Sequence, residues 1–277
     1  MSTDSTSGTV IAQGAEIPAL GLGTAGMSGD DCQRAVETAL AVGYRQIDTA
    51  QLYDNETAVG RAVAESEVDR EDVFVVTKIH PDNAARADVH ESTQRSLERL
   101  ELQTVDLLLL HGPSDEVPLE ETIGAMNELQ HDGLVEHIGI SNFGIDGLED
   151  AMAHSETPIV TNQVKYHPFH QPDDLVTYCV ENEILLTAYS PLAEGAVVGD
   201  DRLESIGEPY DKSAAQVALR WLIQHPYVAA IPKAASREHI EANADIFDFE
   251  LSPEEMRAVF ELGGGPSDRL VDQLQLE

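Results

Sequence analysis

Three polar residues that could act on a carbonyl group stand at the ends of successive apolar runs: Asp48, Lys78 and His111. Each must lie at the edge of the core, where loss of water and neighbouring charges shift pKa values. Together with Tyr53, these residues could form one catalytic group. A buried Lys78 would lower the pKa of the Tyr53 phenol, Asp48 would keep the lysine charged, and a neutral histidine could direct a substrate oxygen. This combination predicts general-acid chemistry on a carbonyl.

Each of these residues also has a purely structural interpretation when it is taken alone. Asp48 could cap the turn before a helix that starts near Glu56. Lys78 could be a surface lysine that extends toward solvent, although the chain has only four lysines. His111 could be a hydrogen-bonded core histidine, and Tyr53 could pack within its loop. The catalytic interpretation therefore requires all four residues to meet in space.

The elements that must position these residues alternate along the chain. Short apolar runs, typical of strands buried on both faces of a parallel sheet, occupy 20–23, 45–48, 73–77, 105–110, 137–140, 159–163, 184–188 and 228–231. Helix-like segments occupy 31–41, 56–65, 86–100, 119–131, 145–153, 173–181, 213–224 and 236–246. Eight strand-plus-helix units predict an α/β fold, a (β/α)8 TIM barrel, whose polar strand ends gather at one face.

Segments outside the eight units predict further features. Residues 9–11 and 16–17 around Gly14 predict a short N-terminal hairpin that closes the bottom of the barrel. Residues 251–262 predict an extra C-terminal helix, with Ser252 as N-cap and Pro253 in its first turn. The long connection 190–212 predicts an active-site loop, and the tail after GGGP is expected to be mobile. No linker interrupts the chain, so 1–277 is expected to be one domain.

Charge excludes several classes of partner. The 277 residues include 51 acidic and 16 basic ones, which gives a net charge of −35. Such a field repels phosphate backbones and anionic headgroups, so neither a nucleic acid nor a membrane surface is expected as a partner. Many acidic residues with few lysines suit a cytoplasm of molar salt, which predicts a halophilic protein. An acidic protein of ordinary salt is the alternative.

The cysteines and the start of the chain predict a cytoplasmic location. Cys32 and Cys179 are far apart and stand outside any CxxC motif, which indicates neither a disulfide framework nor a cysteine metal site. The first ten residues have no basic region and no apolar core, so no signal peptide is expected. No run of about 18 apolar residues suggests a membrane span.

Several short motifs occur in a fixed order along the chain. They are GLGT (21–24), IDTAQLYDNE (47–56), VG (59–60), VVTKI (75–79), DLLLLH (106–111), GISNF (139–143), NQVKYHP (162–168), AYSPL (188–192) and IPKA (231–234). Together they resemble the aldo-keto reductases, in the compact prokaryotic form of the 2,5-diketogluconate reductases. The resemblance implies an NAD(P)H-dependent oxidoreductase that reduces aldehydes or ketones to alcohols. It assigns proton donation to Tyr53 and carbonyl orientation to His111, while Lys78 and Asp48 tune the tyrosine.

The same resemblance implies the contacts of the NAD(P) cofactor. Ser141, Asn142 and Gln163 would hold the nicotinamide carboxamide, and Tyr189 would stack on the nicotinamide ring. The segment from Ser190 to Leu192 would meet the pyrophosphate. The remaining implied contacts are Thr24, Asp48, Lys233, Ser236, His239 and Asn243. Without the resemblance, Tyr189 could be core packing, and Ser141 and Asn142 could cap the following helix.

The chain departs from the family pattern in the expected substrate pocket. The four residues Asp48, Tyr53, Lys78 and His111 are called the tetrad below. Positions beside it often carry tryptophan in the family, and here they are Ala25, His80 and Gly112. Aromatic walls give a pocket its shape selection and apolar area, so this pocket is expected to be wider and more polar. The expected partner is a small-molecule carbonyl substrate, and a monomer is favoured over an oligomer.

The adenosine end of the cofactor site departs as well. Ala234 and His239 stand where NADPH-selective members commonly carry a serine or threonine and an arginine. An arginine holds a phosphate with two hydrogen bonds and stays charged, which a histidine does not do reliably. Lys233 can still pair with a 2′-phosphate. NADP is therefore favoured, with NAD possible and discrimination between them looser than usual.

Two other functions remain open at this point. A Schiff-base aldolase could use Lys78 as its nucleophile, although Tyr53 and the motifs at 139–143 and 188–192 would then have no role. A cofactor-sensing regulatory or binding subunit of the same fold is the other alternative, and the intact tetrad argues against it. Neither reading requires a metal, and no metal site is predicted.

Overall fold

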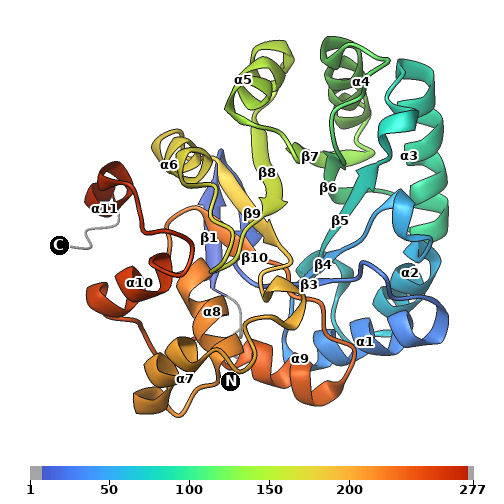
Figure 1. The fold of residues 1–277 in the computed structure, drawn as a ribbon. Helices are drawn as coiled ribbons and strands as arrows, with labels where there is room; N and C mark the ends of the chain where they lie inside the picture. Colours follow the sequence, from blue (N-terminus) through green and yellow to red (C-terminus); the bar gives the residue numbers. More distant parts are fainter. Residues whose placement is uncertain (1–7, 274–277) are drawn as a thin grey trace.

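The computed structural model describes residues 8–273 and contains a barrel of eight parallel strands surrounded by helices (Figure 1). The strands are β3 (Gly21–Gly23), β4 (Gln46–Asp48), β5 (Phe74–Ile79), β6 (Val105–Leu110), β7 (Val135–Ser141), β8 (Ile159–Lys165), β9 (Leu185–Tyr189) and β10 (Val228–Ala230). They pair in chain order. A parallel bridge between Leu20 and Ala230 joins the first strand to the last. The predicted barrel fold is confirmed.

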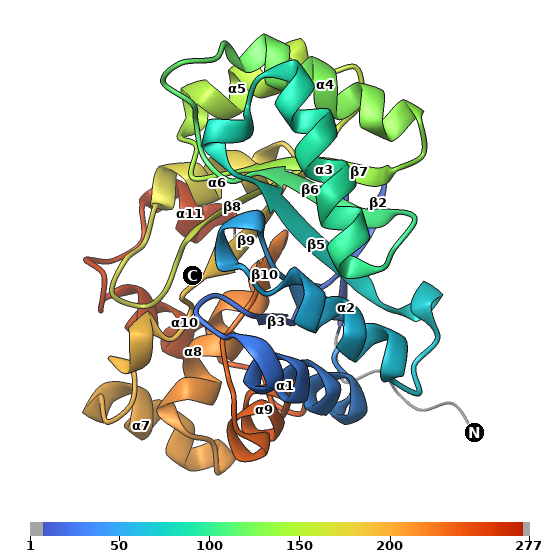
Figure 2. The same cartoon turned by 90° about the vertical axis from the view of Figure 1, so that its right-hand side faces the viewer.

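Helices cover the outside of the barrel (Figure 2). They are α1 (Gly29–Val42), α2 (Glu56–Glu65), α3 (Arg86–Leu100), α4 (Leu119–His131), α5 (Ile145–His154), α6 (Asp173–Glu181), α8 (Ala214–Ile223) and α9 (Arg237–Ala244). Four predicted segments match their helices residue for residue, and the others differ by one or two residues at an end. Within residues 8–273, no helix has both the length and the apolar composition needed to cross a bilayer.

An antiparallel hairpin, β1 (Thr9–Ala12) and β2 (Ala15–Pro18), closes the amino-terminal end of the barrel. Gln13 in its turn donates to the backbone oxygen of Asn182, just before β9 begins. The buried side chains of Ala12, Ala15 and Ile17 form one apolar cluster with inner side chains of the strands. These strand residues are Val76, Leu107, Leu109, Val160, Leu185 and Ala229. The predicted plug is therefore confirmed.

The C-terminal segment contains two helices. The predicted extra helix is α10 (Pro253–Phe260), and Ser252 and Glu255 form a reciprocal capping box at its start. The tail beyond it, expected to be mobile, contains α11 (Asp268–Gln273). Leu270 is fully buried there, and Arg269 pairs with Glu181 of α6 over 2.5 Å. The tail that was expected to be mobile therefore forms a helix that packs against the core up to residue 273.

The long connection 190–212 is only partly a loop. It contains α7 (Asp201–Gly207), and the Asp200 side chain caps this helix by accepting from the backbone N–H groups of Arg202 and Leu203. Leu203 is fully buried in the main core. The cap and this one apolar anchor explain a short helix that acidic, glycine-rich composition did not indicate.

Residues 1–7, part of the segment on which the absence of a signal peptide was argued, lie outside the described residues. Residues 274–277 lie outside them as well.

Close packing between neighbouring helices explains one glycine of the sequence motifs. Gly60 lies in α2, opposite the end of α3. A Cβ atom added at Gly60 would lie 2.7 Å from the Cα of Leu100 and closer still to the Leu100 carbonyl group. Backbone atoms cannot move aside as a flexible side chain can, so this contact requires glycine. By contrast, a Cβ on Gly124 in α4 would meet nothing within 4 Å.

The two glycines predict opposite effects of the same substitution. Gly60→Ala should push α2 away from α3 and lower the free energy of unfolding by about 2 kcal/mol, as overpacked sites do. Gly124→Ala should raise it by about 0.5–1 kcal/mol, because alanine loses less backbone entropy in a helix. Urea unfolding followed by circular dichroism measures both changes. Equal effects of the two substitutions would contradict this description of the helix packing.

Candidate active site

The carboxyl ends of the parallel strands bring distant polar residues to one end of the barrel. Asp48 ends β4, Lys78 lies one residue before the end of β5, and His111 directly follows β6. Tyr53 lies in the short 3-10 helix η1 (Gln51–Tyr53) after β4. The predicted meeting of these four residues is confirmed by the contacts that follow.

A buried ion pair forms the centre of the site. Lys78 is fully buried, and its Nζ donates to Asp48 Oδ1 over 2.5 Å and to the backbone oxygen of Thr49 over 2.8 Å. The same Nζ lies 3.5 Å from Tyr53 Oη. Asp48 Oδ2 accepts from Gln163 Nε2 over 2.7 Å. The interpretations of Lys78 as a surface lysine and of Asp48 as a turn cap are therefore wrong.

The surroundings of Tyr53 keep its phenol protonated. Burial raises the pKa of Tyr53, and the negative charge of Asp48 raises this pKa further. The expected net lowering of the Tyr53 pKa is wrong, because burial and Asp48 outweigh the opposite effect of the Lys78 ammonium group. Burial lowers the pKa of Lys78 itself, while Asp48 opposes that shift. At neutral pH Tyr53 can therefore act as a proton donor rather than as a base.

His111 lies beside Tyr53 and is neutral at pH 7. The two ring centroids are 5.6 Å apart in an edge-on arrangement. Burial, together with Lys78 and His80, lowers the pKa of His111 to about 4. Its buried Nδ1 has no hydrogen-bond partner among residues 8–273, whereas both ring nitrogens of the core residue His225 are hydrogen-bonded. The interpretation of His111 as a hydrogen-bonded core histidine is therefore wrong.

Two buried residues of the 47–56 motif support the site, and the sequence assigned them no role. Asn55 ties the first two strand-end loops together, since its Nδ2 donates to the backbone oxygen of Thr24 over 2.9 Å. Glu56 accepts from the Thr77 hydroxyl over 2.5 Å and pairs with Arg99 over 2.6 Å. Their position inside the longest motif is the signal that could have marked them.

Residues at the ends of β7 and β9 contact one another across the mouth of the barrel. Asn142 Nδ2 donates to the backbone oxygen of His111 over 2.8 Å, and Asn142 Oδ1 accepts from the Tyr189 hydroxyl over 3.0 Å. Ser141 Oγ donates to the backbone oxygen of Gln163 over 2.8 Å. No side chain caps α5, so the helix-cap interpretation of Ser141 and Asn142 is wrong. The half-buried Tyr189, bonded to Asn142, is not plain core packing.

A second group of predicted cofactor residues lies after β10, at the start of α9. Lys233 is exposed, and its Nζ lies 3.7 Å from the position that a Cβ on Gly26 would take, in the loop after β3. Ser236 caps α9 by accepting from the backbone N–H of His239. Asn243 lies buried further along α9. Lys233, Ser236 and His239 therefore share one end of a helix.

The remaining predicted cofactor residues have different surroundings. Thr24 is fully buried, and its Oγ1 donates to the backbone oxygen of Asp48 over 2.9 Å. Its side chain therefore fixes two strand ends and does not open to the mouth, which argues against the predicted cofactor contact. Ser190 follows β9 with a φ of +49°, and Leu192 is half-buried against the main core. This segment lies at the strand-end face, as predicted.

Small and polar residues stand beside the tetrad where a substrate would enter. Ala25 is exposed, and Gly112 is buried near Pro81. His80 is half-buried, and its Nδ1 accepts from the backbone N–H of Asp82 over 3.2 Å. None of the three predicted pocket residues supplies a large aromatic wall beside the tetrad.

The residues at the mouth fit an NADP cofactor. Lys233 has no carboxylate within ion-pair distance in the part of the chain that the structure describes, although the sequence carries 51 acidic residues. An unpaired ammonium group beside a helix N-terminus matches a phosphate. The side chains of Ser141, Asn142 and Gln163 offer both donors and acceptors, which a carboxamide requires.

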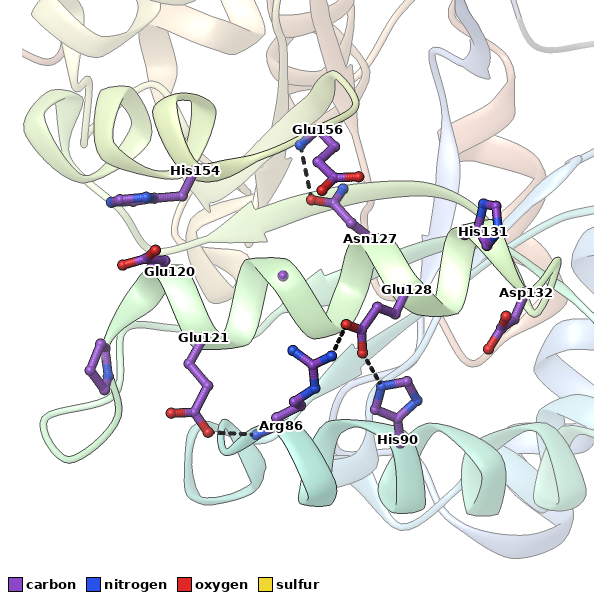
Figure 3. Close-up of a pocket in the computed structure, with 12 residues that line it drawn as sticks. Arg86, His90, Glu120, Glu121, Asn127, Glu128, His131, Asp132, His154 and Glu156 are labelled. Atoms are coloured by element: carbon purple, nitrogen blue, oxygen red, sulfur yellow. Dashed lines mark hydrogen bonds and ion pairs between the residues drawn. The ribbon is translucent and has the colours of Figure 1, made fainter.

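A groove on the outer helices is a less suitable site (Figure 3). It has a volume of about 870 Å³ and is lined by residues of α3, α4 and the end of α5. Its central carboxylate is engaged, because Glu128 pairs with both Arg86 and His90. No three His, Cys, Asp or Glu side chains among the described residues are grouped to hold a metal ion. The strand-end face is therefore the candidate active site.

Comparison with known proteins identifies related reductases. The model of the aldo/keto reductase family matches residues 19–263. Glyoxal reductase of Bacillus subtilis is 40% identical over 244 residues, which cover 88% of each chain. Methylglyoxal reductase DkgB of Escherichia coli O157:H7 is 40% identical over 258 residues, 92% of this chain and 96% of the relative. A crystal structure assigned to a 2,5-diketo-D-gluconic acid reductase B is 45% identical with a TM-score of 0.91, over 93% of this chain and 92% of that one.

The cofactor follows from related structures. An aldo-keto reductase of Bombyx mori solved in complex with NADP is 32% identical, with a TM-score of 0.86 over 93% of each chain. The chain is an enzyme that reduces carbonyl compounds with NAD(P)H, and NADP is its cofactor. No comparison supports the aldolase or the regulatory subunit. The family match over most of the chain, on a barrel with these residues at its mouth, shows that the chain belongs to the aldo-keto reductase family.

Proposed function

We propose that this enzyme reduces small dicarbonyl compounds, such as 2-oxoaldehydes, with Tyr53 as the general acid. The observation that carries the proposal is the 3.5 Å separation between Tyr53 Oη and the Nζ of the fully buried Lys78. The substrate class is supported by the glyoxal and methylglyoxal reductases among the relatives. An entrance formed by Ala25, His80 and Gly112 also suits a small polar substrate better than an aromatic one.

The tetrad divides the proton chemistry among its members. Tyr53 holds its proton at neutral pH because burial and Asp48 raise its pKa. When bound, the reduced nicotinamide supplies a hydride to the carbonyl carbon. Tyr53 gives its proton to the carbonyl oxygen, and the phenolate that remains is stabilised by the ammonium group of Lys78. His111, with a pKa of about 4, can hold the carbonyl oxygen without carrying a charge.

Asp48 connects this proton chemistry to cofactor binding. One of its carboxylate oxygens bonds the lysine, and the other fixes the amide of Gln163. In our proposal Gln163 holds the nicotinamide carboxamide together with Ser141 and Asn142. Tyr189, fixed by its hydrogen bond to Asn142, stacks on the ring and selects its face. A displaced Asp48 would therefore impair both functions.

The other end of the cofactor lies along the later strands in this proposal. The segment from Ser190 to Leu192 meets the pyrophosphate. Lys233, Ser236 and His239, at the start of α9, meet the 2′-phosphate, and Asn243 lies further along the same helix. Because histidine is a weaker phosphate ligand than arginine, NADP is preferred over NAD by a smaller margin than in members with arginine.

We also propose that residues 1–277 form one domain that acts as a monomer in a cytoplasm of high salt. One apolar cluster contains residues from Leu20 to Leu270, which supports a single domain. Both cysteines are buried and unpaired, as in a reducing compartment. Exposed large apolar side chains among the described residues are scattered singly, which supports a monomer. They are Ile11, Leu52, Met152 and Val198.

An aldolase that uses Lys78 as its nucleophile is not favoured by the geometry. A Schiff base forms on an accessible, uncharged amine. The Nζ of Lys78 is instead fully buried and donates to Asp48 and to the backbone of Thr49. These contacts hold the lysine as a cation beside Tyr53, in agreement with its proposed role in reduction.

Tyr53→Phe tests the general acid. It removes the proton donor and leaves the cofactor contacts in place, so kcat for methylglyoxal should fall by about 10²-fold or more, while the Kd for NADPH stays within twofold. Turnover is followed by the absorbance of the reduced cofactor. Tyr210→Phe is the matched control, since its hydroxyl bonds Glu255 away from the strand ends and the variant should keep full activity. Near wild-type turnover of Tyr53→Phe would overturn the proposal.

Two substitutions test the proposed binding site of the cofactor 2′-phosphate. His239→Arg should supply a two-bond phosphate ligand and raise the preference for NADPH over NADH by about tenfold, or 1.4 kcal/mol. Lys233→Met should lower that preference by weakening NADPH binding alone. Kd values for both cofactors, measured by titration of protein fluorescence, give the ratio. If the ratio of Lys233→Met equals that of the wild type, the 2′-phosphate binds elsewhere.

Salt dependence tests the halophilic proposal. A net charge of −35 on one barrel opposes folding at low ionic strength through mutual repulsion. Raising KCl from about 0.1 M to about 1 M shortens the screening length from roughly 10 Å to 3 Å. Tm, measured by scanning calorimetry, should therefore rise across this range, and activity should persist at the upper end. A flat or falling Tm would reject the halophilic proposal and leave the reductase assignment intact.

A further inference from the structure

Lys165 occupies the mouth of the barrel beside the proposed nicotinamide-stacking residue. It is the last residue of β8 and is half-buried. Side chains alternate along a strand, and Gln163, two residues earlier, points inward to Asp48. The side chain of Lys165 therefore points to the same side of the strand as that of Gln163, two residues further along β8. Its direct partner in the parallel pairing of β8 with β9 is Tyr189.

Lys165 is one of two lysines that no acidic residue neutralises in the part of the chain that the structure describes. Lys78 pairs with Asp48, and Lys212 pairs with two aspartates of the segment after α9. Lys165 and Lys233 have no ion pair with any residue from 8 to 273. Both lysines lie at the strand-end face of the barrel. In a chain with 51 acidic residues and four lysines, two unmatched ammonium groups at one face favour an anionic ligand.

The positive charge of Lys165 acts on a neighbouring histidine. His167, two residues further along, is buried, and the pKa of His167 is lowered to about 4 by burial and then by Lys165. Glu194 raises the pKa of His167, and among the described residues it forms no ion pair with Lys165. The segment expected to meet the pyrophosphate begins at Ser190, directly after the register partner of Lys165.

We propose that Lys165 is a second phosphate-binding lysine, which pairs with the pyrophosphate that NADP and NAD share. Lys233 then serves only the 2′-phosphate that distinguishes them. A lysine is suited to this position because its ammonium group binds phosphate oxygens as a point charge from several directions. The inference rests on the cofactor arrangement of the proposed function. It adds a residue whose effect is common to both dinucleotides, and it explains how so acidic an enzyme admits an anionic cofactor.

Direct binding measurements without substrate test this division of roles. Kd values for NADPH and NADH are determined by fluorescence titration for the wild type, Lys165→Met, Lys233→Met and Arg61→Met. Lys165→Met should weaken both dinucleotides by a similar factor, about tenfold, and Lys165→Arg should restore most of the loss. Lys233→Met should weaken NADPH alone. Arg61→Met is the matched control: Arg61 is exposed on α2 without an ion pair among the described residues, so it removes the same charge far from the mouth.

Several outcomes would overturn the inference. An unchanged Kd in Lys165→Met, or a loss confined to NADPH, would show that Lys165 does not serve the shared pyrophosphate. A rise only in the KM of a carboxylate-bearing substrate would assign the lysine to the substrate instead. An equal loss in Arg61→Met would mean that net charge alone acts. If Lys165→Met proves unstable by its Tm, Lys165→Gln replaces it. Failure of the wild type to bind either dinucleotide would instead refute the proposed function.

Discussion

The buried ion pair between Lys78 and Asp48 is the interaction on which the rest of the site depends. Each charge taken out of water costs several kcal/mol unless its hydrogen-bonding groups are matched. Asp48 uses both carboxylate oxygens, on Lys78 and on Gln163, and the lysine adds the backbone oxygen of Thr49. These partners come from β4, β5 and β8. The pair can therefore exist only where the barrel holds distant strands in register, and it then supplies the cation that Tyr53 requires.

The barrel separates an apolar end from a polar one. At the amino-terminal end, the hairpin and the inner strand residues form a continuous apolar cluster. At the carboxyl-terminal end, the strands stop before the helices begin and leave polar side chains facing a common space. Hydrogen bonds between successive loops, such as those of Asn55 and Asn142, join these strand ends to one another. A site assembled from many loops can in this way stay ordered.

Electrostatics divides the molecule in a second way. The surface is acidic, with a net charge of −35, and its field opposes the approach of a phosphate-bearing cofactor. At the mouth, by contrast, Lys233 and Lys165 lack acidic partners among the described residues. Local charge at short range can outweigh a diffuse surface field, and increasingly so when salt screens the more distant charges. An acidic surface suited to high salt and a cofactor site for an anion are therefore compatible in one barrel.

The sequence by itself determined the order of the elements and the residues at the strand ends, because hydrophobic periodicity and strand length are local properties. It therefore predicted α2 residue for residue and placed Asp48, Lys78 and His111 at one face. Only the tertiary structure decided the rest. The short helices α7 and α11 form because Leu203 and Leu270 find distant partners in the core. The pKa of Tyr53 rises rather than falls because burial and the field of Asp48 depend on the whole packed site, which no local pattern encodes.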